Sequence, residues 1–264
     1  MIIYKSEEEI KAMRRSNQIV AKILAELGSM IKPGIQTKDL DEYAEMRAKE
    51  FGAVPAFRGY RGFPASLCTS INEEIVHGLP SSRRLQEGDI ISLDFGVLYE
   101  GFYGDAAVTY SVGKISSLAK KLISTAEEAF FKGLDQIKEG KRVSDISYAI
   151  QKYVESQGFS VIRSFVGHGI GLSLHEEPQV PNFGFPGRGP KIKKGLVLAI
   201  EPMICVGNWN VKILPDNWTA ITQDRSLSAH FEHTVALSSA GSEILSSLDD
   251  EDLNFHYLKE NQYA

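Results

Sequence analysis

The chain contains an internal repeat at a spacing of about 106 residues, which limits the folds that it can adopt. IKPGIQTKDL (31–40) resembles IKEGKRVSDI (137–146), and both segments lie between amphipathic stretches that predict helices. The glycine that ends each second predicted helix keeps this spacing. Further along, LQEGDIISLDFG around Gly88 resembles IKKGLVLAIEPM around Gly195, at a spacing of 107. These matches predict a duplicated helix–helix–sheet unit; two unrelated α+β halves with shared turn residues are the alternative.

Helices are predicted at the start of each repeat. Ser6 followed by Glu9 is a capping box, so the first helix begins there and extends to about Gly28 or slightly beyond. The second helix ends near Phe51–Gly52, and its counterpart in the other half ends at Gly158. The apolar residues of the two long helices recur at helical spacing: Ile10, Met13, Val20, Ile23, Leu27 and Met30 in one, and Leu118, Leu122, Ile123, Ala126 and Phe130 in the other.

Both repeats belong to one domain, because no linker rich in Pro, Gly or Ser separates them. We expect a single domain over residues 1–248, with pseudo-repeats at about 5–112 and 113–246. A duplicated unit usually packs around an approximate two-fold axis and places its site in the groove between the halves. Residues 178–190 are predicted to form a long loop, and residues 249–264 a polar, acidic tail.

Composition excludes several classes of protein. A net charge of −5 and a pI near 5.8 give no support for nucleic acid as the main ligand. Two cysteines are too few for a disulfide framework, which suits the reducing cytoplasm. Acidic residues stand near the N-terminus where a signal peptide is apolar, and no run approaches the roughly 18 apolar residues of a membrane span. We therefore expect a cytoplasmic protein without a membrane or nucleic-acid partner.

Two aspartates in adjacent predicted strands are candidates for a metal site. Asp94 ends the apolar run of IISLDFG, and Asp105 follows in FYGDAA, beyond a turn signal. A two-residue loop at Tyr99–Glu100 would place Asp94 directly opposite Asp105, whereas a one-residue slip would turn side chains to the other face. Two buried carboxylates at that distance repel, so at least one is protonated unless a cation lies between them. A solvated turn position is the alternative for either aspartate.

Three further side chains extend this cluster. Glu201, in LAIEPM, is the repeat partner of Asp94, and Glu232 precedes another apolar run. His168 has a glycine on either side, which disfavours a helix and predicts a strand that runs into a tight loop. Four carboxylates with one imidazole favour Mn²⁺, Fe²⁺, Co²⁺ or Mg²⁺ over a thiolate-type zinc site. Two divalent ions would neutralise their charge, whereas unrelated buried ion pairs would need Lys or Arg, which these strands lack.

Longer motifs occur along the chain: SINEEIVHGLP, DFG followed by GFYGD, GHGIG, HEEP, IEPM and DRSLSAHFEHT. Together they resemble the motifs of the type I methionine aminopeptidases, and the resemblance covers nearly all of residues 2–248. It implies an α+β pita-bread fold with two pseudo-symmetric helix–helix–sheet halves, an antiparallel sheet and a central dinuclear metal site. Only 33 residues separate His168 from Glu201, too few for the large insertion of the type II enzymes.

The resemblance also implies roles for individual residues. His77 looks like the histidine that helps to position the substrate and to stabilise its tetrahedral state, and His175 looks like the one that reaches the scissile carbonyl. Glu201 is expected to accept the proton of the attacking water. Asp105 and Glu232 would bridge two metal ions. The complete set of metal ligands implied by the resemblance is Asp94, Asp105, His168, Glu201 and Glu232.

A substrate pocket that is apolar and partly aromatic follows from the same resemblance. Leu174 stands where an aromatic ring is common in the family, and His230 stands where glutamine is usual. We expect these departures to reshape the pocket and the local hydrogen bonding without abolishing the site. His233 is expected to support a ligand rather than to bind metal. The residues at the pocket positions are Tyr60, Phe63, Cys68, His77, His175 and Trp218.

The implied activity is removal of the initiator methionine from proteins and peptides by metal-activated hydrolysis. We expect two divalent ions per chain (Mn, Fe, Co or Zn) and a monomer that meets nascent polypeptides at the ribosome. The nearest alternative is a Xaa-Pro aminopeptidase of the same fold, which the missing extra N-terminal domain and the short spacing before Glu201 disfavour. A non-catalytic binding protein would be expected to lose metal ligands, and all five are present.

Overall fold

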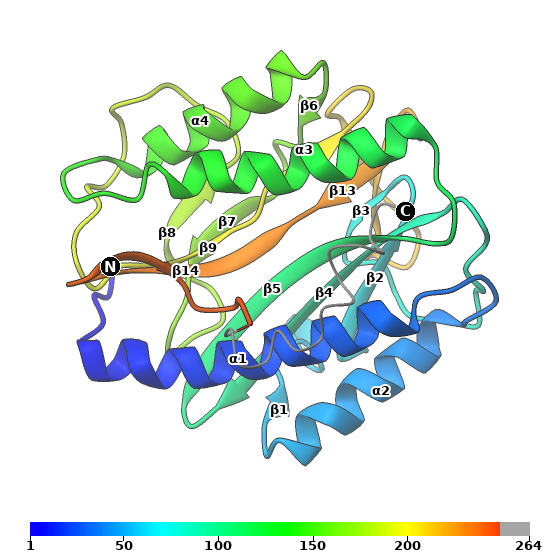
Figure 1. The fold of residues 1–264 in the computed structure, drawn as a ribbon, viewed down its shortest axis with the longest axis horizontal. Coiled ribbons are helices and arrows are strands. Elements are labelled where there is room, and N and C mark those ends of the chain that lie inside the picture. The colour runs from blue at the N-terminus through cyan, green and yellow to red at the C-terminus, as the bar shows by residue number, and fades with distance from the viewer. Residues whose placement is uncertain (249–264) are drawn as a thin grey trace.

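The computed structural model describes residues 1–248, and its layers follow the predicted repeat (Figure 1). Two helices from the N-terminal half lie over one part of a large twisted sheet, and two from the C-terminal half lie over the other part. The predicted tail, 249–264, lies outside the described residues. No helix within residues 1–248 is long and apolar enough to span a bilayer. The helices are α1 (Glu7–Met30), α2 (Thr37–Glu50), α3 (Ser117–Leu134) and α4 (Val143–Ser156), with a 3₁₀ segment at Tyr60–Gly62.

The large sheet is antiparallel and has the strand order β1-β4-β5-β14-β9-β7-β8. In addition, β2 pairs with β4 and β15 pairs with β14. Strand β14 lies between strands of the two halves, so it joins them into one continuous sheet. The strands are β1 (Val54–Pro55), β2 (Leu67–Ile71), β4 (Ile90–Tyr99), β5 (Phe102–Ser111), β7 (Val166–Gly169), β8 (Glu176–Pro181), β9 (Val197–Ile200), β14 (Glu232–Ser238) and β15 (Gly241–Ile244).

Two three-stranded sheets accompany the large one, in the orders β13-β10-β6 and β11-β12-β3. Segments next to their strands line the cavity over the site, through His77, Phe165 and Trp218. Their strands are β3 (Glu74–Val76), β6 (Ser160–Val161), β10 (Met203–Cys205), β11 (Val211–Ile213), β12 (Ala220–Thr222) and β13 (Ser228–His230).

The sequence repeat has a counterpart in backbone geometry. Gly34 and Gly140, one in each half, both adopt left-handed backbone, with φ of 94° and 89°. The N–H of Gly34 donates to the carbonyl of Leu85 at 2.8 Å, and the N–H of Gly140 donates to the carbonyl of Ile192 at 3.1 Å. Equivalent loops therefore dock on equivalent segments, and the backbone favours glycine at both turns. The other related pairs also adopt left-handed backbone: φ is 71° and 86° at Gly52 and Gly158, and 93° and 85° at Gly88 and Gly195.

Helix α1 has the cap and the amphipathic face that its sequence predicts. The Ser6 hydroxyl accepts a hydrogen bond from the N–H of Glu9, and the Glu9 carboxylate accepts one from the N–H of Ser6. In α3, however, Leu118 is 46% exposed, and its neighbour Ala119 takes the buried position in the first turn of that helix. The α1 residues predicted to face inward are all buried except Met30, which is half-buried: Ile10, Met13, Val20, Ile23 and Leu27.

Each pair of helices packs on the sheet through its own hydrophobic core. One core joins Leu27 of α1 to the odd-numbered residues of β4, Ile91 to Val97, and the other joins Phe130 of α3 to Leu198 of β9. Side chains alternate between the two faces of a strand. Because the odd-numbered residues of β4 face the helices, Asp94 points to the opposite face, where the site forms.

The turn between β4 and β5 differs from the predicted one by a single position. The two-residue loop is Glu100–Gly101, with left-handed φ of 49° and 84°, instead of Tyr99–Glu100. Asp94 therefore pairs with Ala107, two residues beyond Asp105. A shift of two residues preserves the face of every side chain, so the aspartates are diagonal neighbours instead of direct opposites.

The glycine-rich segment around His168 forms β7 and then a loop, as predicted. The long loop predicted at 178–190 was wrong at its start, because residues 178–181 continue β8. Two prolines, Pro178 and Pro181, made this segment resemble a loop. An edge strand tolerates proline, and β8 is the last strand of the sheet order.

Candidate metal centre and active site

Five neighbouring strands of the large sheet bring the predicted metal ligands together. In the order β4-β5-β14-β9-β7, each strand carries one of these residues or ends beside it. The residues are far apart in the chain, so strand order and not sequence proximity produces the cluster. From β4 to β7 they are Asp94, Asp105, Glu232, Glu201 and His168.

Strand register sets these side chains at nearly one level of the sheet. Ala107 of β5 pairs with Asp94 of β4 on one side and with Glu232 of β14 on the other. Asp105 is two residues from Ala107, so its side chain leaves the same face. The last pair between β9 and β14 precedes Glu201 by one residue, which places Glu201 beside Glu232.

His168 presents a ring nitrogen to the carboxylates. Its Nε2 lies 3.9 Å from Oδ2 of Asp105 and 3.6 Å from Oε1 of Glu201. Ligand atoms of Asp105, His168 and Glu232 all lie within 4.8 Å of one another. Burial lowers the pKa of His168 to about 4, so its ring is neutral at pH 7. Its Nδ1 lies 2.9 Å from the carbonyl of Gly169, so Nδ1 carries the proton and Nε2 keeps a lone pair for a metal.

Burial opposes ionisation of the four carboxyl groups when no cation is bound. It raises the pKa of Asp94 to about 7. Burial first, and the neighbouring carboxylates second, raise the pKa values of Asp105, Glu201 and Glu232 well above their usual range. One buried oxygen each of Asp94, Asp105 and Glu232 has no hydrogen-bond partner within residues 1–248. These oxygens fit a bound cation, which would supply both the missing partner and the compensating charge.

The glycines beside His168 allow β7 to fit between its neighbouring strands. A Cβ atom on Gly167 would lie 2.4 Å from the carbonyl oxygen of Ala199 in β9. One on Gly169 would lie 2.3 Å from the carbonyl oxygen of Glu177 in β8. Both distances are too short for a real Cβ atom. The glycines therefore permit a close approach to the adjacent backbones, which fixes the position of His168.

A cavity of about 340 Å³ opens over this cluster. It is bounded by strands of both halves and by the 3₁₀ segment. Every residue predicted for metal binding, catalysis or substrate binding lines it: Tyr60, Phe63, Cys68, His77, Asp94, Asp105, His168, His175, Glu201, Trp218 and Glu232.

Two histidines line the cavity beside the carboxylates. Nδ1 of His175 lies 2.8 Å from the hydroxyl of Tyr60, and the His175 ring centroid lies 4.2 Å from that of His168. His77 has a left-handed φ of 61°, uncommon outside glycine, and its ring packs edge-on against Phe165 at 5.4 Å. Desolvation lowers the pKa of both His77 and His175. Both rings are therefore neutral near pH 7, and each has one N–H to donate.

The other wall of the cavity is apolar. Phe63 and Trp218 meet edge to face with centroids 5.1 Å apart, and Leu174 is buried in the same wall. Burial, and then the nearby Asp94, raise the pKa of the Cys68 thiol well above its usual value. Cys68 therefore stays protonated and forms part of the wall instead of acting as a nucleophile.

The two histidines of the segment SAHFEHT differ in their surroundings. Nδ1 of His233 lies 2.8 Å from the Ser246 hydroxyl, and its ring packs in an aromatic group on the helix side of the sheet. His230 is buried next to the cluster, with Nε2 3.8 Å from an oxygen of Glu201 and 3.8 Å from an oxygen of Glu232.

Some residues at the cavity were not singled out by sequence patterns. Phe57 and Phe165 line it, but isolated aromatic residues in loops carry no signal of their own. Lys5 forms a buried ion pair with Glu176, the residue after His175. These two charges are 171 positions apart, so no local pattern reveals their contact.

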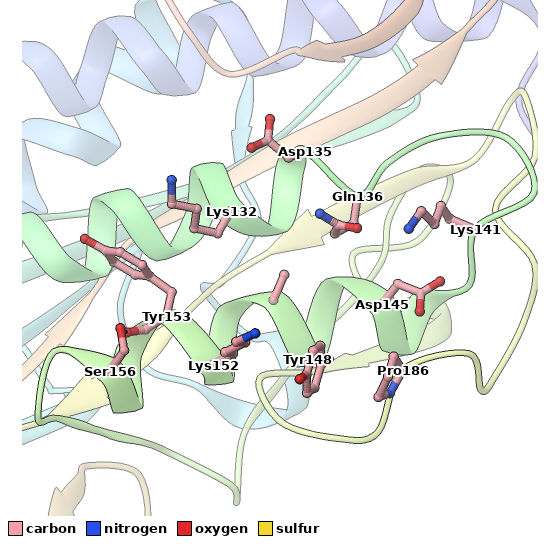
Figure 2. Close-up of a pocket in the computed structure, with 11 residues that line it drawn as sticks. Lys132, Asp135, Gln136, Lys141, Asp145, Tyr148, Lys152, Tyr153, Ser156 and Pro186 are labelled. Carbon is pink, nitrogen blue, oxygen red and sulfur yellow. The ribbon is translucent and has the colours of Figure 1, made fainter.

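A second cavity, of about 530 Å³, lies along α3 and α4, and no predicted site residue lines it (Figure 2). Lys132 there lies 5.6 Å from the ring centre of Tyr153. The Asp145 carboxylate accepts hydrogen bonds from the N–H groups of Arg142 and Gly187, at 2.8 and 2.7 Å. Because these charged groups already stabilise local structure, we assign the active site to the cavity over the carboxylates.

A duplicated antiparallel sheet with a buried carboxylate–imidazole cluster at its centre is the architecture of a metallopeptidase. Residues 11–239 match Metallopeptidase family M24, and the chain belongs to this family. It is 54% identical over 246 residues to the methionine aminopeptidase of Clostridium acetobutylicum. The aligned residues cover 93% of this chain and 98% of that one. It is 53% identical over 245 residues to methionine aminopeptidase 1 of Bacillus subtilis, covering 93% and 99% of the two chains.

A solved structure agrees with these relatives. The crystal structure of methionine aminopeptidase from Thermotoga maritima superposes with a TM-score of 0.92 at 46% identity, covering 94% of this chain and 100% of that one. The expected pita-bread fold and the resemblance to methionine aminopeptidases are both confirmed.

Proposed function

We propose that this chain removes the N-terminal methionine from proteins and peptides by metal-dependent hydrolysis. The observation that carries the proposal is one cavity in which a carboxylate–imidazole cluster, two neutral histidines and an apolar wall meet. Relatives that are more than half identical over 93% of the chain are methionine aminopeptidases. The chain is therefore a metalloaminopeptidase, and its apolar wall suits the unbranched side chain of methionine.

The donor set supports two divalent ions. Four ionised carboxylates carry a charge of −4, which two divalent ions neutralise. Asp105 and Glu232 extend from the adjacent strands β5 and β14 at the middle of the cluster. Together with Asp94, His168 and Glu201 they would hold the ions. Oxygen ligands with one imidazole suit Mn²⁺, Fe²⁺ or Co²⁺, and Zn²⁺ also accepts such a set.

The bound metal would supply a water whose pKa is lowered from 15.7 towards about 7. The chain itself provides proton transfer and charge stabilisation. Glu201 accepts the proton of the attacking water and passes it to the leaving amine. His77 and His175 each donate one hydrogen bond to the carbonyl oxygen as negative charge develops on it. Phe63 and Trp218 hold the methionine side chain.

We place this activity in the cytoplasm, on nascent polypeptides at the ribosome. Cys68 and Cys205 are both free and buried, as suits a reducing compartment. An initiator methionine first becomes accessible where the nascent chain leaves the ribosome. One chain supplies the whole cavity, so a monomer is sufficient for the reaction.

The proposal is tested on protein stripped with a chelator, with Mn²⁺, Co²⁺, Fe²⁺ or Zn²⁺ then added back. Met-Ala-Ser and Ala-Pro-Ser compete as substrates. Metal-dependent release of methionine alone is the expected result, and the rates rank the metals. Cleavage before proline would instead indicate a Xaa-Pro aminopeptidase, and inactivity with every metal would indicate a binding protein.

A further inference from the structure

His230 is a buried histidine that the proposed reaction does not use. It ends β13 with 1% of its surface exposed, and neither of its ring nitrogens has a hydrogen-bond partner within residues 1–248. Burying a polar group without a partner costs free energy, because its lost contacts with water are not replaced. A role in which the ring gains a hydrogen-bond partner would explain why a histidine is buried at this position.

The backbone at His230 is held firmly. The Thr109 hydroxyl donates to the carbonyl of His230 at 2.7 Å and accepts from its N–H at 2.9 Å. The same hydroxyl lies 2.8 Å from that of Ser92, and β10 pairs Met203 with His230 on another side. Because the backbone is held on both sides, the His230 ring keeps its position beside the carboxyl groups that it faces.

The ring of His230 faces two of the carboxyl groups of the cluster. Its Nε2 lies 3.8 Å from Oε2 of Glu201 and 3.8 Å from Oε2 of Glu232. The other oxygen of Glu201, Oε1, lies 3.6 Å from Nε2 of His168. Glu201 is thus placed between two imidazoles, with one oxygen towards each. A hydrogen bond from His230 needs an approach of only about 1 Å, which rotation of either glutamate side chain can provide.

We propose that His230 is a positioning residue of the metal centre. Its Nε2–H donates to the facing oxygen of Glu201 or Glu232 when these groups are ionised, and so holds the carboxylate in the orientation that binds metal. This inference rests on the proposed metal-dependent function. Carboxylate ligands are commonly held in this way by a hydrogen-bond donor, and loss of such a donor costs about 10- to 100-fold in metal affinity.

Two variants test this role. His230→Leu removes the donor at similar size, and His230→Gln keeps an N–H donor of similar reach. We would titrate each metal-free protein with Co²⁺, following the visible absorption of the bound ion, and measure kcat and KM for Met-Ala-Ser. We expect His230→Leu to weaken Co²⁺ binding about 10- to 100-fold and to lower kcat with little change in KM. His230→Gln should restore both values to within about threefold of the original, a margin set by the modest worth of one hydrogen bond.

Ser228→Ala is the matched control, because Ser228 lies in the same strand and donates to the carbonyl of Ile204 at 2.9 Å. Because Ser228→Ala loses this hydrogen bond, it should lower the melting temperature and leave Co²⁺ affinity unchanged. In contrast, His230→Leu should not lower the melting temperature of the metal-free protein, since no hydrogen bond is lost there. A purely structural role of His230 predicts the reverse: His230→Leu would lower the melting temperature of the metal-free protein and leave its Co²⁺ affinity unchanged.

Three results would overturn the positioning role. Unchanged Co²⁺ affinity in His230→Leu would exclude it. Failure of His230→Gln to recover, together with a changed Co²⁺ spectrum, would show His230 to be a direct ligand instead. An original protein that binds no Co²⁺ at all would refute the proposed function itself, and His230 would lose its role with it.

Discussion

The hydroxyl of Tyr60 lies 2.8 Å from Nδ1 of His175, and the two rings stack with centroids 5.2 Å apart. A neutral imidazole carries one ring proton. For Nε2 of His175 to donate to the substrate carbonyl, its Nδ1 must be unprotonated and accept a hydrogen bond. The Tyr60 hydroxyl is then the donor. Tyr60, predicted from sequence only as a pocket residue, is thereby placed to select the tautomer that its neighbour needs.

Replacing Tyr60 by Phe separates this role from packing. Tyr60→Phe keeps the stacked ring but removes the hydroxyl, so His175 loses the hydrogen bond that favours its Nε2–H tautomer. We expect kcat for Met-Ala-Ser to fall about 2- to 10-fold, in line with the worth of one hydrogen bond. His175→Ala removes the carbonyl's donor and should cost about 10²–10³. Steady-state kinetics on both variants provides the measurement; equal losses would mean that Tyr60 acts on the substrate directly.

Glu201→Gln should fold and lose almost all activity. The amide keeps the shape of the side chain but cannot accept the water proton, and general base catalysis contributes about 10²–10⁴ in rate. The melting temperature of the metal-free protein should not fall, because Glu201 is held towards its neutral form there by burial and by Asp94. Activity within tenfold of the original would exclude Glu201 as the base.

Much of the site was predictable because strand patterns are local. Asp94 and Glu201 stand out as single charges at the ends of apolar runs, and the repeat relates them to each other. The hairpin register was missed by two residues, because a left-handed Glu100 is uncommon and a turn starting one residue earlier looked equally suitable.

What could not be predicted depends on long-range packing. The approach of His230 to Glu201 arises from β13 and β10 pairing in a separate small sheet. Similarly, the hydrogen bond between Tyr60 and His175 joins residues 115 positions apart. Sequence periodicity reports which face a side chain takes on its own element, and it does not report which loop closes over that face.

Metal affinity should rise steeply with pH between about 6 and 8. Burial raises the pKa of Asp94 to about 7 and those of Asp105, Glu201 and Glu232 well above their usual range, so these groups hold protons in the metal-free protein. Metal binds the ionised forms, so it must displace those protons. His168, with its pKa lowered to about 4, is already neutral and releases none.

The proton release is measured by titration calorimetry with Mn²⁺ at pH 6 and pH 8, in two buffers of different ionisation enthalpy. We expect tighter binding at pH 8 and a heat at pH 6 that depends on the buffer, as proton release requires. Binding of equal strength at both pH values, with buffer-independent heat, would show that the carboxylates are ionised before metal arrives.

Lys5 and Glu176 form the ion pair that holds the loop bearing His175. Their side chains are only 2% and 5% exposed, and Glu176 also accepts a hydrogen bond from the N–H of Ser173 at 3.2 Å. Lys5→Met leaves a buried carboxylate without its cation. We expect a loss of about 3–5 kcal/mol in the free energy of unfolding, measured in urea on the metal-free protein. Adding Glu176→Gln should recover a large part of this loss, because no uncompensated charge then remains.

An exposed pair gives the comparison that decides whether burial is the cause. Arg15 and Glu100 also form an ion pair, but their side chains are 54% and 47% exposed. Arg15→Met should therefore cost no more than about 1 kcal/mol. If Lys5→Met proves equally mild, water reaches Glu176 and the pair does not hold the loop. If the large loss occurs, Lys5→Met should also lower kcat. The added Glu176→Gln should restore kcat together with stability, because the loop again fixes His175 beside the carboxylates.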